Sequence, residues 1–365
     1  MRRISISCLK PGMKLGSPIY NSRSDELLVP GVTLTDTYIC RLRDLGLSYV
    51  WIEDEVFTGL EVNEVVSLKT RIATIRKIRD ITMNTKVTGK LLVNPEELYD
   101  TVNSFISEIF QNKDAIFYLS YLYSYDDYIF SHSVNVCIMA LMTGITLGYR
   151  GTKLTDLGVG ALLHDLGKIK IPENIINKPG KLTVEEFEIV KMHTSFGYEL
   201  IKEANNLRGS TAIIALHHHE NYDGSGYPSG IPGEKIPEYV QVVGIADRFD
   251  AIASDRIYRK AYSPNEAFEM CAASGNYYFK ENVVNAFLYN IAVYPRGAIV
   301  ELNDGSIALV LDTPRGYPLF PRVQILCNRF GREDKLKREV SLVDRGDLYI
   351  VRILNGDEEE LLNII

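Results

Sequence analysis

All six histidines of this 365-residue chain lie in one stretch, between His132 and His219. Carboxylates are interspersed with them, and Asp247 follows a short distance further on. Neutral imidazole nitrogens and anionic carboxylate oxygens are the donors that a cluster of divalent metal ions needs. The stretch therefore predicts a metal-dependent hydrolytic site whose ligands come from several elements of the fold.

The run ALLHDLGK, which ends at Lys168, carries the strongest of these signals. Its apolar residues indicate a buried helix end, where adjacent side chains diverge by about 100°. His164 and Asp165 could therefore reach two metals, or one metal from two sides, and the carboxylate could bridge two cations. Lys168 lies on the same face and could hydrogen-bond a metal-activated hydroxide or a phosphoryl oxygen.

The other histidines gain their meaning from one another. Alone, His132 would more often be structural, and the apolar face around His193 would favour a core or capping role. The run His217, His218, His219 ends an expected helix, where three consecutive residues cannot all face one site but two neighbours can. The loop that follows, NYDGSGYP, contains glycines that permit a close approach to a ligand.

A basic cluster follows on the next expected helix, VQVVGIADRFDAIASDRIYRKAYS, which also carries Asp247 and Asp250 three residues apart. The cluster consists of Arg256, Arg259 and Lys260. A guanidinium can bind a phosphate or a guanine in a bidentate way, so the cluster favours recognition of either. The alternative is a solvated helix end whose cations complement the helix dipole.

Composition limits the classes of protein to which the chain can belong. A hydrophobic content of 46% supports a sizeable core, and a net charge of −7 argues against a nucleic acid polymer as partner. The five cysteines are far apart, which fits a reducing compartment. The most apolar window, 134–149, is shorter than a membrane span, and the start lacks a signal peptide. We expect no membrane span and a cytoplasmic location.

The pattern of the whole chain predicts a mainly α protein with small modules at both ends. We expect a small mixed α+β module over 1–56, a helical linker over 57–112, a helical catalytic domain over 113–293, and a small β module with an acidic tail over 294–365. The apolar stripe within 62–82 is short for a coiled coil, so a bridge between domains is favoured over a dimerising helix. A homodimer stays open.

Four motifs in order resemble the HD-GYP subgroup of the HD-domain metallophosphohydrolases. They are HDLGK at 164–168, KPGKLT at 178–183, HHENYDGSGYP at 218–228 and ADRFDAIASDRIYRK at 246–260. The resemblance covers roughly half of the chain and implies a helical HD fold. It also implies hydrolysis of cyclic di-GMP to pGpG, GMP or both, by a hydroxide that two metals activate.

The resemblance further implies which residues bind the metals. The first metal would be held by His132, His164, Asp165 and Asp247. The second would be held by Asp165, His193, His218 and His219, so that Asp165 bridges the two. His217 falls outside the motif and is expected to be a core residue or a partner of a ligand. Mixed histidine and carboxylate ligands suit Fe or Mn best, with Ni, Co and Zn left open.

For the substrate, the resemblance implies roles for Lys168 on the hydroxide or the scissile phosphate, and for Tyr227, Arg256 and Arg259 in ligand binding. Lys260 is a weaker candidate. Two departures from the family pattern stand out. Tyr128 occupies the position where some members place a glutamate for a third metal, so we expect two metals, and Ile257 replaces a common proline. Two other functions stay open: a non-catalytic cyclic di-GMP receptor, or a phosphohydrolase of another nucleotide.

Overall fold

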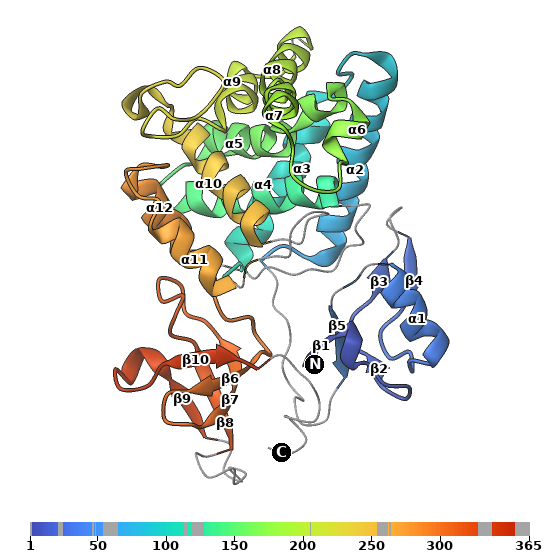
Figure 1. Cartoon of the computed structure of the whole chain (residues 1–365), viewed down its shortest axis with the longest axis vertical. Coiled ribbons are helices and arrows are strands. Elements are labelled where there is room, and N and C mark those ends of the chain that lie inside the picture. Colours follow the sequence, from blue (N-terminus) through green and yellow to red (C-terminus); the bar gives the residue numbers. More distant parts are fainter. Residues whose placement is uncertain are drawn as a thin grey trace. The chain divides into compact units, whose positions relative to one another are not determined.

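The computed structural model describes the chain from residue 2 to residue 354, with gaps. The described ranges are 2–20, 25–45, 47, 49–53, 65–112, 116–117, 128–204, 206–253, 262, 264–327 and 338–354. The chain divides into two compact units (Figure 1). One unit holds the helices of Val65–Lys113 and Ile129–Asn290, and the other holds the strand-rich ends of the chain.

The N-terminal module is a small antiparallel sheet with one α-helix, which confirms the mixed α+β prediction. Its elements are β1 (Arg2–Ser5), β2 (Lys14–Leu15), β3 (Ile19–Tyr20), β4 (Glu26–Leu28), α1 (Asp36–Asp44) and β5 (Tyr49–Glu53), with a 3₁₀ turn η1 (Ile6–Cys8). Strand β5 pairs with β1 and β2, while β3 and β4 form a separate ribbon. Leu15, Leu42 and Val50 belong to the apolar core of this module.

The C-terminal module is a five-stranded antiparallel sheet in the order β10-β6-β7-β8-β9. Its elements are β6 (Ile299–Leu302), β7 (Ile307–Asp312), β8 (Arg322–Cys327), β9 (Glu339–Ser341), η6 (Leu342–Asp344) and β10 (Ile350–Ile353). Four of the strands fall where alternation and turn residues predict them. The sequence analysis did not identify β9, because three residues without an apolar pattern carry no signal until β8 pairs with them.

The helical unit contains the stretch in which all the histidines lie. Its longer helices are α2 (Leu68–Thr88), α3 (Pro95–Gln111), α4 (Tyr128–Thr146), α5 (Gly151–Leu163), α7 (Val184–Lys191), α8 (His193–Glu203), α9 (Gly209–His217), α10 (Glu238–Ala253), α11 (Pro264–Ala272) and α12 (Glu281–Leu288). Short turns of helix join them at η4 (Leu166–Lys170), α6 (Glu173–Ile176) and η5 (Gly233–Lys235). The helices of the predicted linker, α2 and α3, belong to this unit.

Helix α4 is the centre of the helical unit. Its apolar window is almost fully buried, with Val136, Ala140 and Leu141 at 0% exposure. In Figure 1 the ribbons of α4 and α5 run through the middle of this unit. Throughout the part of the chain that the structure describes, each helix is too short or too polar to cross a membrane.

Candidate metal centre

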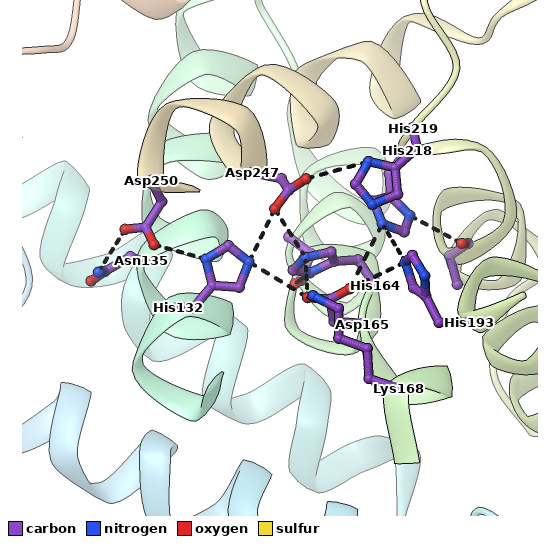
Figure 2. Close-up of polar contacts among 12 residues, drawn as sticks. His132, Asn135, His164, Asp165, Lys168, His193, His218, His219, Asp247 and Asp250 are labelled. Carbon is purple, nitrogen blue, oxygen red and sulfur yellow. Dashed lines mark hydrogen bonds and ion pairs between the residues drawn. The ribbon is translucent and has the colours of Figure 1, made fainter. Parts of the chain in front are cut away.

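Seven side chains converge at the middle of the helical unit, and they are the seven that the sequence analysis predicts as metal ligands. They are His132 of α4, His164 at the end of α5, Asp165 before η4, His193 at the start of α8, His218 and His219 after α9, and Asp247 of α10 (Figure 2). Six of the seven are buried, and His219 is partly exposed. Elements that are far apart in the sequence therefore share one polar centre inside an apolar domain.

The ligand atoms fall into two groups, and within each group all of them lie within 4.8 Å of one another. The first ligand group consists of His132, His164 and Asp247. The second ligand group consists of Asp165, His193, His218 and His219. Each group offers three or four nitrogen and oxygen donors at the spacing that one divalent cation requires.

Asp165 lies between the two groups and directs one oxygen toward each. Its Oδ2 is 3.4 Å from Nε2 of His164 and 3.6 Å from Nε2 of His132. Its Oδ1 is 3.4 Å from Nε2 of His193 and 3.9 Å from Nε2 of His218. A carboxylate in this position can bind one cation through each oxygen, which is the arrangement that a bridging ligand needs.

Asp247 also spans the two groups, which the sequence analysis did not anticipate. Its Oδ1 is 3.1 Å from Nε2 of His132, and its Oδ2 is 3.7 Å from Nδ1 of His219. The sequence-based prediction assigns this residue to the first metal alone. The orientation of α10 explains the difference, because it brings the carboxylate edge-on between α4 and the end of α9 (Figure 2).

Four of the histidines use their outer ring nitrogen to fix the ring. The Nδ1 atoms of His164, His193 and His218 donate to the carbonyl oxygens of Ala161, Val190 and Ala215 at 2.8, 2.7 and 3.0 Å. That of His132 donates to Oδ2 of Asp250 at 2.7 Å. A proton held on Nδ1 leaves Nε2 directed into the centre as the ring atom that can bind a metal, as in metal-binding histidines generally.

The charges of the second ligand group suit a cation. Burial raises the pKa of Asp165, but Lys168 and His164 outweigh it and hold that pKa well below its usual range. Burial holds the pKa of His218 well below its usual range and lowers that of His219 to about 3. The Asp165 carboxylate is therefore ionised and these imidazoles are neutral, which are the forms that bind metals.

The first ligand group differs in its protonation. Burial lowers the pKa of His164, but ionised Asp165 outweighs it and raises the pKa to about 10. The pKa of His132 is also raised, since hydrogen bonds to Asp247 and Asp250 outweigh the effect of burial. Cations that bind this group must displace protons from its two histidines.

A close backbone contact positions Asp165 against His193. Helix α5 ends at Leu163, and the chain turns through η4, which packs against α8. A β-carbon on Gly167 would lie 1.9 Å from the carbonyl oxygen of His193 and 2.4 Å from the backbone nitrogen of Gly197. Only glycine fits at this point, so the HDLGK motif holds the Asp165 carboxylate next to His193 of the second ligand group.

Two predicted substrate residues lie at the same centre. The ammonium group of Lys168 forms an ion pair with Oδ2 of Asp165. The ring of Tyr227 lies beside that of His219, with ring centroids 4.7 Å apart. Burial raises the pKa of Tyr227, and the negative charges of Asp247 and Asp165 raise it further. The hydroxyl of Tyr227 therefore keeps its proton.

Other predicted residues are not brought to the centre or cannot be placed. Nδ1 of His217 lies 3.5 Å from Oε1 of Glu220, away from both ligand groups. Arg256, Ile257, Arg259 and Lys260 lie outside the described residues. Tyr128 begins α4, and its side chain is likewise outside the described part of the structure.

Two residues with a role around the centre were not predicted. Asp250 is fully buried and accepts from His132, and its spacing of three residues from Asp247 was the available signal. Glu220 is 2% exposed, and its carboxylate accepts from the backbone N–H groups of Ser229 and Ile231 at 2.8 and 3.2 Å. It thereby holds the loop that carries Tyr227. The HHE motif contained it without indicating this role.

The residues present fit a pair of metal ions. Among the described residues, Nε2 of His164 and Oδ1 of Asp165 are buried without a hydrogen-bond partner. Native structures rarely leave buried polar atoms unsatisfied unless a water or an ion binds them. Each of these two atoms belongs to a different face of the centre, so one cation in each ligand group would satisfy both.

Comparison with known proteins gives two domain matches. Residues 120–283 match the model of the HD domain, and residues 299–362 match a KOW domain associated with the HD domain. The first match contains all seven predicted ligands, and the second coincides with the C-terminal strands.

Curated relatives carry consistent names. A cyclic di-GMP phosphodiesterase of Pseudomonas aeruginosa is 33% identical over 68% of this chain and 59% of its own length. The cyclic di-GMP phosphodiesterase PdeB of Borreliella burgdorferi is 32% identical over 63% of this chain and 61% of its own length. A cyclic di-GMP phosphodiesterase of Thermotoga maritima is 45% identical over 39% of each chain. This chain thus spans about three fifths of the length of the first two relatives and about two fifths of the length of the third.

Proposed function

We propose that the protein is a metal-dependent phosphodiesterase that hydrolyses cyclic di-GMP, because residues 120–283 match the HD domain. The observation that carries the proposal is the position of Asp165, whose two oxygens face two separate groups of histidines. The names of the relatives support the choice of substrate. A receptor that only bound the nucleotide would not need two complete sets of metal ligands.

The two ligand groups would each hold one divalent ion, with Asp165 and Asp247 facing both. Two such ions supply Lewis-acid activation of water and neutralise charge on a phosphate. Fe and Mn match this donor set best, and Ni, Co and Zn also accept nitrogen and oxygen donors. Among the described residues, both ligand groups consist of histidine and aspartate alone, so neither group includes a thiolate.

Hydrolysis of the phosphodiester adds one water. The water oxygen bonds to phosphorus, the bond to the ribose 3′ oxygen breaks, and that oxygen takes up a proton to give pGpG. A second hydrolysis of pGpG would give GMP. In this proposal Lys168 donates to a phosphoryl oxygen as charge develops there, and the ion pair of its ammonium group with Asp165 supports that role.

Substrate binding would involve the surface beside the second ligand group. The ring of Tyr227 lies against that of His219. It is also edge-on to the ring of Phe187, with the centroids of Tyr227 and Phe187 6.1 Å apart. An aromatic surface of this kind can stack on a base. By the family motif, Arg256, Arg259 and Lys260 would bind the phosphate or the guanine.

One assay tests the proposal and separates it from its rivals. Purified protein is loaded with Mn²⁺ or Fe²⁺ and given cyclic di-GMP, and the products are separated by chromatography. We expect pGpG, GMP or both. Binding without turnover would instead identify a receptor, and neither binding nor turnover would indicate a different nucleotide. The Asp165→Ala variant should lose turnover together with bound metal, and near-normal turnover by it would contradict the two-metal assignment.

A further inference from the structure

A buried arginine lies at the end of a chain of polar contacts that leads to the metal centre. Arg71 is on α2, before the region that matches the HD domain, and only 4% of its surface is exposed. Its Nη2 donates to Oδ1 of Asn135 on α4 at 2.6 Å. Burying a guanidinium costs free energy unless it is hydrogen-bonded. The hydrogen bond to Asn135 therefore matters for keeping Arg71 buried and for fixing its orientation.

The contacts continue from the amide to a predicted metal ligand. Nδ2 of Asn135 donates to Oδ1 of Asp250 at 2.9 Å, and Oδ2 of Asp250 accepts from Nδ1 of His132 at 2.7 Å. Figure 2 shows Asn135, Asp250 and His132 in line, with Nε2 of His132 turned toward Asp165 and Asp247. All of these side chains are buried, with exposures of 8% or less.

Hydrogen-bond chemistry gives this line a direction. A guanidinium only donates, so the oxygen of the Asn135 amide must face Arg71 and its NH₂ group must face Asp250. The reverse orientation would put the amide oxygen against a carboxylate oxygen. A carboxylate only accepts, so Nδ1 of His132 carries a proton, and Nε2 is the ring atom left to bind a metal once the cation displaces its proton.

We propose that Arg71 is a positioning residue for the first ligand group: through Asn135 and Asp250 it fixes the tautomer and the orientation of His132. This inference rests on the proposed metal centre. The alternative is that Arg71 only ties α2 to α4 and contributes to stability alone. The two differ because a positioning residue alters the affinity of one metal site, whereas a purely structural contact alters both sites or neither.

The test is calorimetric titration of the metal-free, full-length protein with Mn²⁺. Partners of a ligating histidine typically change metal affinity 10- to 100-fold. We expect Arg71→Met to weaken one of two Mn²⁺ sites about tenfold and to leave the other unchanged. Arg71→Lys, which keeps a positively charged donor but loses the planar guanidinium, should recover part of the affinity. Arg76 is an exposed arginine on the same helix. Arg76→Met is therefore the matched control, and it should bind Mn²⁺ as the wild type does.

A second variant makes the test independent of the buried charge. Asn135→Leu removes the amide that links Arg71 to Asp250, and it should weaken the same site to a similar extent. The double variant Arg71→Met/Asn135→Leu should be no weaker than Asn135→Leu alone, because residues in one line of contacts are not additive. Wild-type affinity in Asn135→Leu, equal weakening of both sites in Arg71→Met, or additive effects in the double variant would each overturn the inference.

The outcomes also separate this inference from the proposed function. If the wild-type protein binds no Mn²⁺, the metal centre is wrong and the positioning role is wrong with it. If the wild type binds two ions and the variants match it, only the positioning role is overturned. If the variants behave as expected but cyclic di-GMP is not hydrolysed, the positioning role stands and only the proposed substrate is wrong.

Discussion

Gly167 and His193 are in direct backbone contact, so that a β-carbon at position 167 would lie 1.9 Å from the carbonyl oxygen at position 193. The contact sets the distance between η4, which follows Asp165, and α8, which His193 begins. The geometry of the second ligand group therefore depends on Gly167, a residue that has no side chain with which to bind a metal.

The Gly167→Ala variant should separate η4 from α8, because the clash is with backbone atoms that cannot rotate away. Overpacking of this kind costs roughly 1–3 kcal/mol, and we expect a lower melting temperature together with reduced metal content. Gly209→Ala is the control, since a β-carbon there has open space around it and the residue begins a helix. Thermal unfolding and elemental analysis measure both variants, and an unchanged Gly167→Ala protein would contradict the prediction.

Lys168→Met should reduce turnover while leaving the metals bound. The ammonium group contacts Asp165 but belongs to neither ligand group, so its loss removes a donor to the phosphate and not a ligand. Removing one such donor typically lowers kcat by about 10²–10³-fold. Steady-state kinetics and metal analysis check this, with exposed Lys170→Met as the control. Loss of metal in Lys168→Met would show that the lysine acts on the centre itself.

Glu220→Gln should affect substrate binding more than the chemical step. The buried carboxylate accepts from two backbone N–H groups of the loop that carries Tyr227, and an amide can accept only one of them through its oxygen. An unsatisfied buried N–H costs about 1–3 kcal/mol, so the loop should loosen. We expect KM for cyclic di-GMP to rise with a smaller change in kcat. Exposed Glu234→Gln on the same loop serves for comparison, and a fall in kcat alone would refute the loop interpretation.

Lys178 and Thr183 of the KPGKLT motif both contact Glu186, and the stability that these contacts provide should be lost in acid. Glu186 accepts from Lys178 at 2.6 Å and from the backbone N–H of Thr183 at 2.7 Å, in a capping box at the start of α7. The lysine first, and then the backbone, lower the pKa of Glu186 from its ordinary value of 4.5. A depressed folded-state pKa stabilises the protein above the unfolded pKa, and this effect is lost as the pH falls through the folded-state value.

Glu186→Gln should therefore melt at a lower temperature than the wild type at pH 7, and the difference should shrink steadily below about pH 4.5. Melting curves of both proteins across this range measure the effect. Glu188→Gln on the same helix controls for the loss of one surface negative charge. A difference that stays constant, or grows in acid, would exclude Glu186 as the titrating group.

The sequence predicted the mainly α fold with its two small modules, because helical periodicity in the middle of the chain and strand patterns at its ends are local signals. The resemblance to the HD-GYP subgroup implied the seven side chains that converge, because the motifs that carry most of them are long and occur in order. It did not indicate that Asp247 faces both ligand groups, since that depends on how α10 is oriented against its neighbours.

The residues that support the centre were harder to predict. Arg71 and Asn135 are separated by 64 residues and carry no motif, and their relation exists only because α2 packs beside α4. The end of α5 was expected to continue as a helix through Asp165, but the backbone changes to a 3₁₀ turn there. Its reason is a backbone contact to α8, which no local pattern contains.

Asp247 is the last of the seven ligands along the chain, and each of its oxygens faces a different ligand group. During synthesis from the N-terminus, every other ligand leaves the ribosome before α10 does. A nascent chain that ends before α10 therefore lacks the carboxylate of the first ligand group and the second carboxylate that faces both groups, so the centre can be completed only when the domain is nearly whole. An unfinished chain therefore cannot present the complete centre.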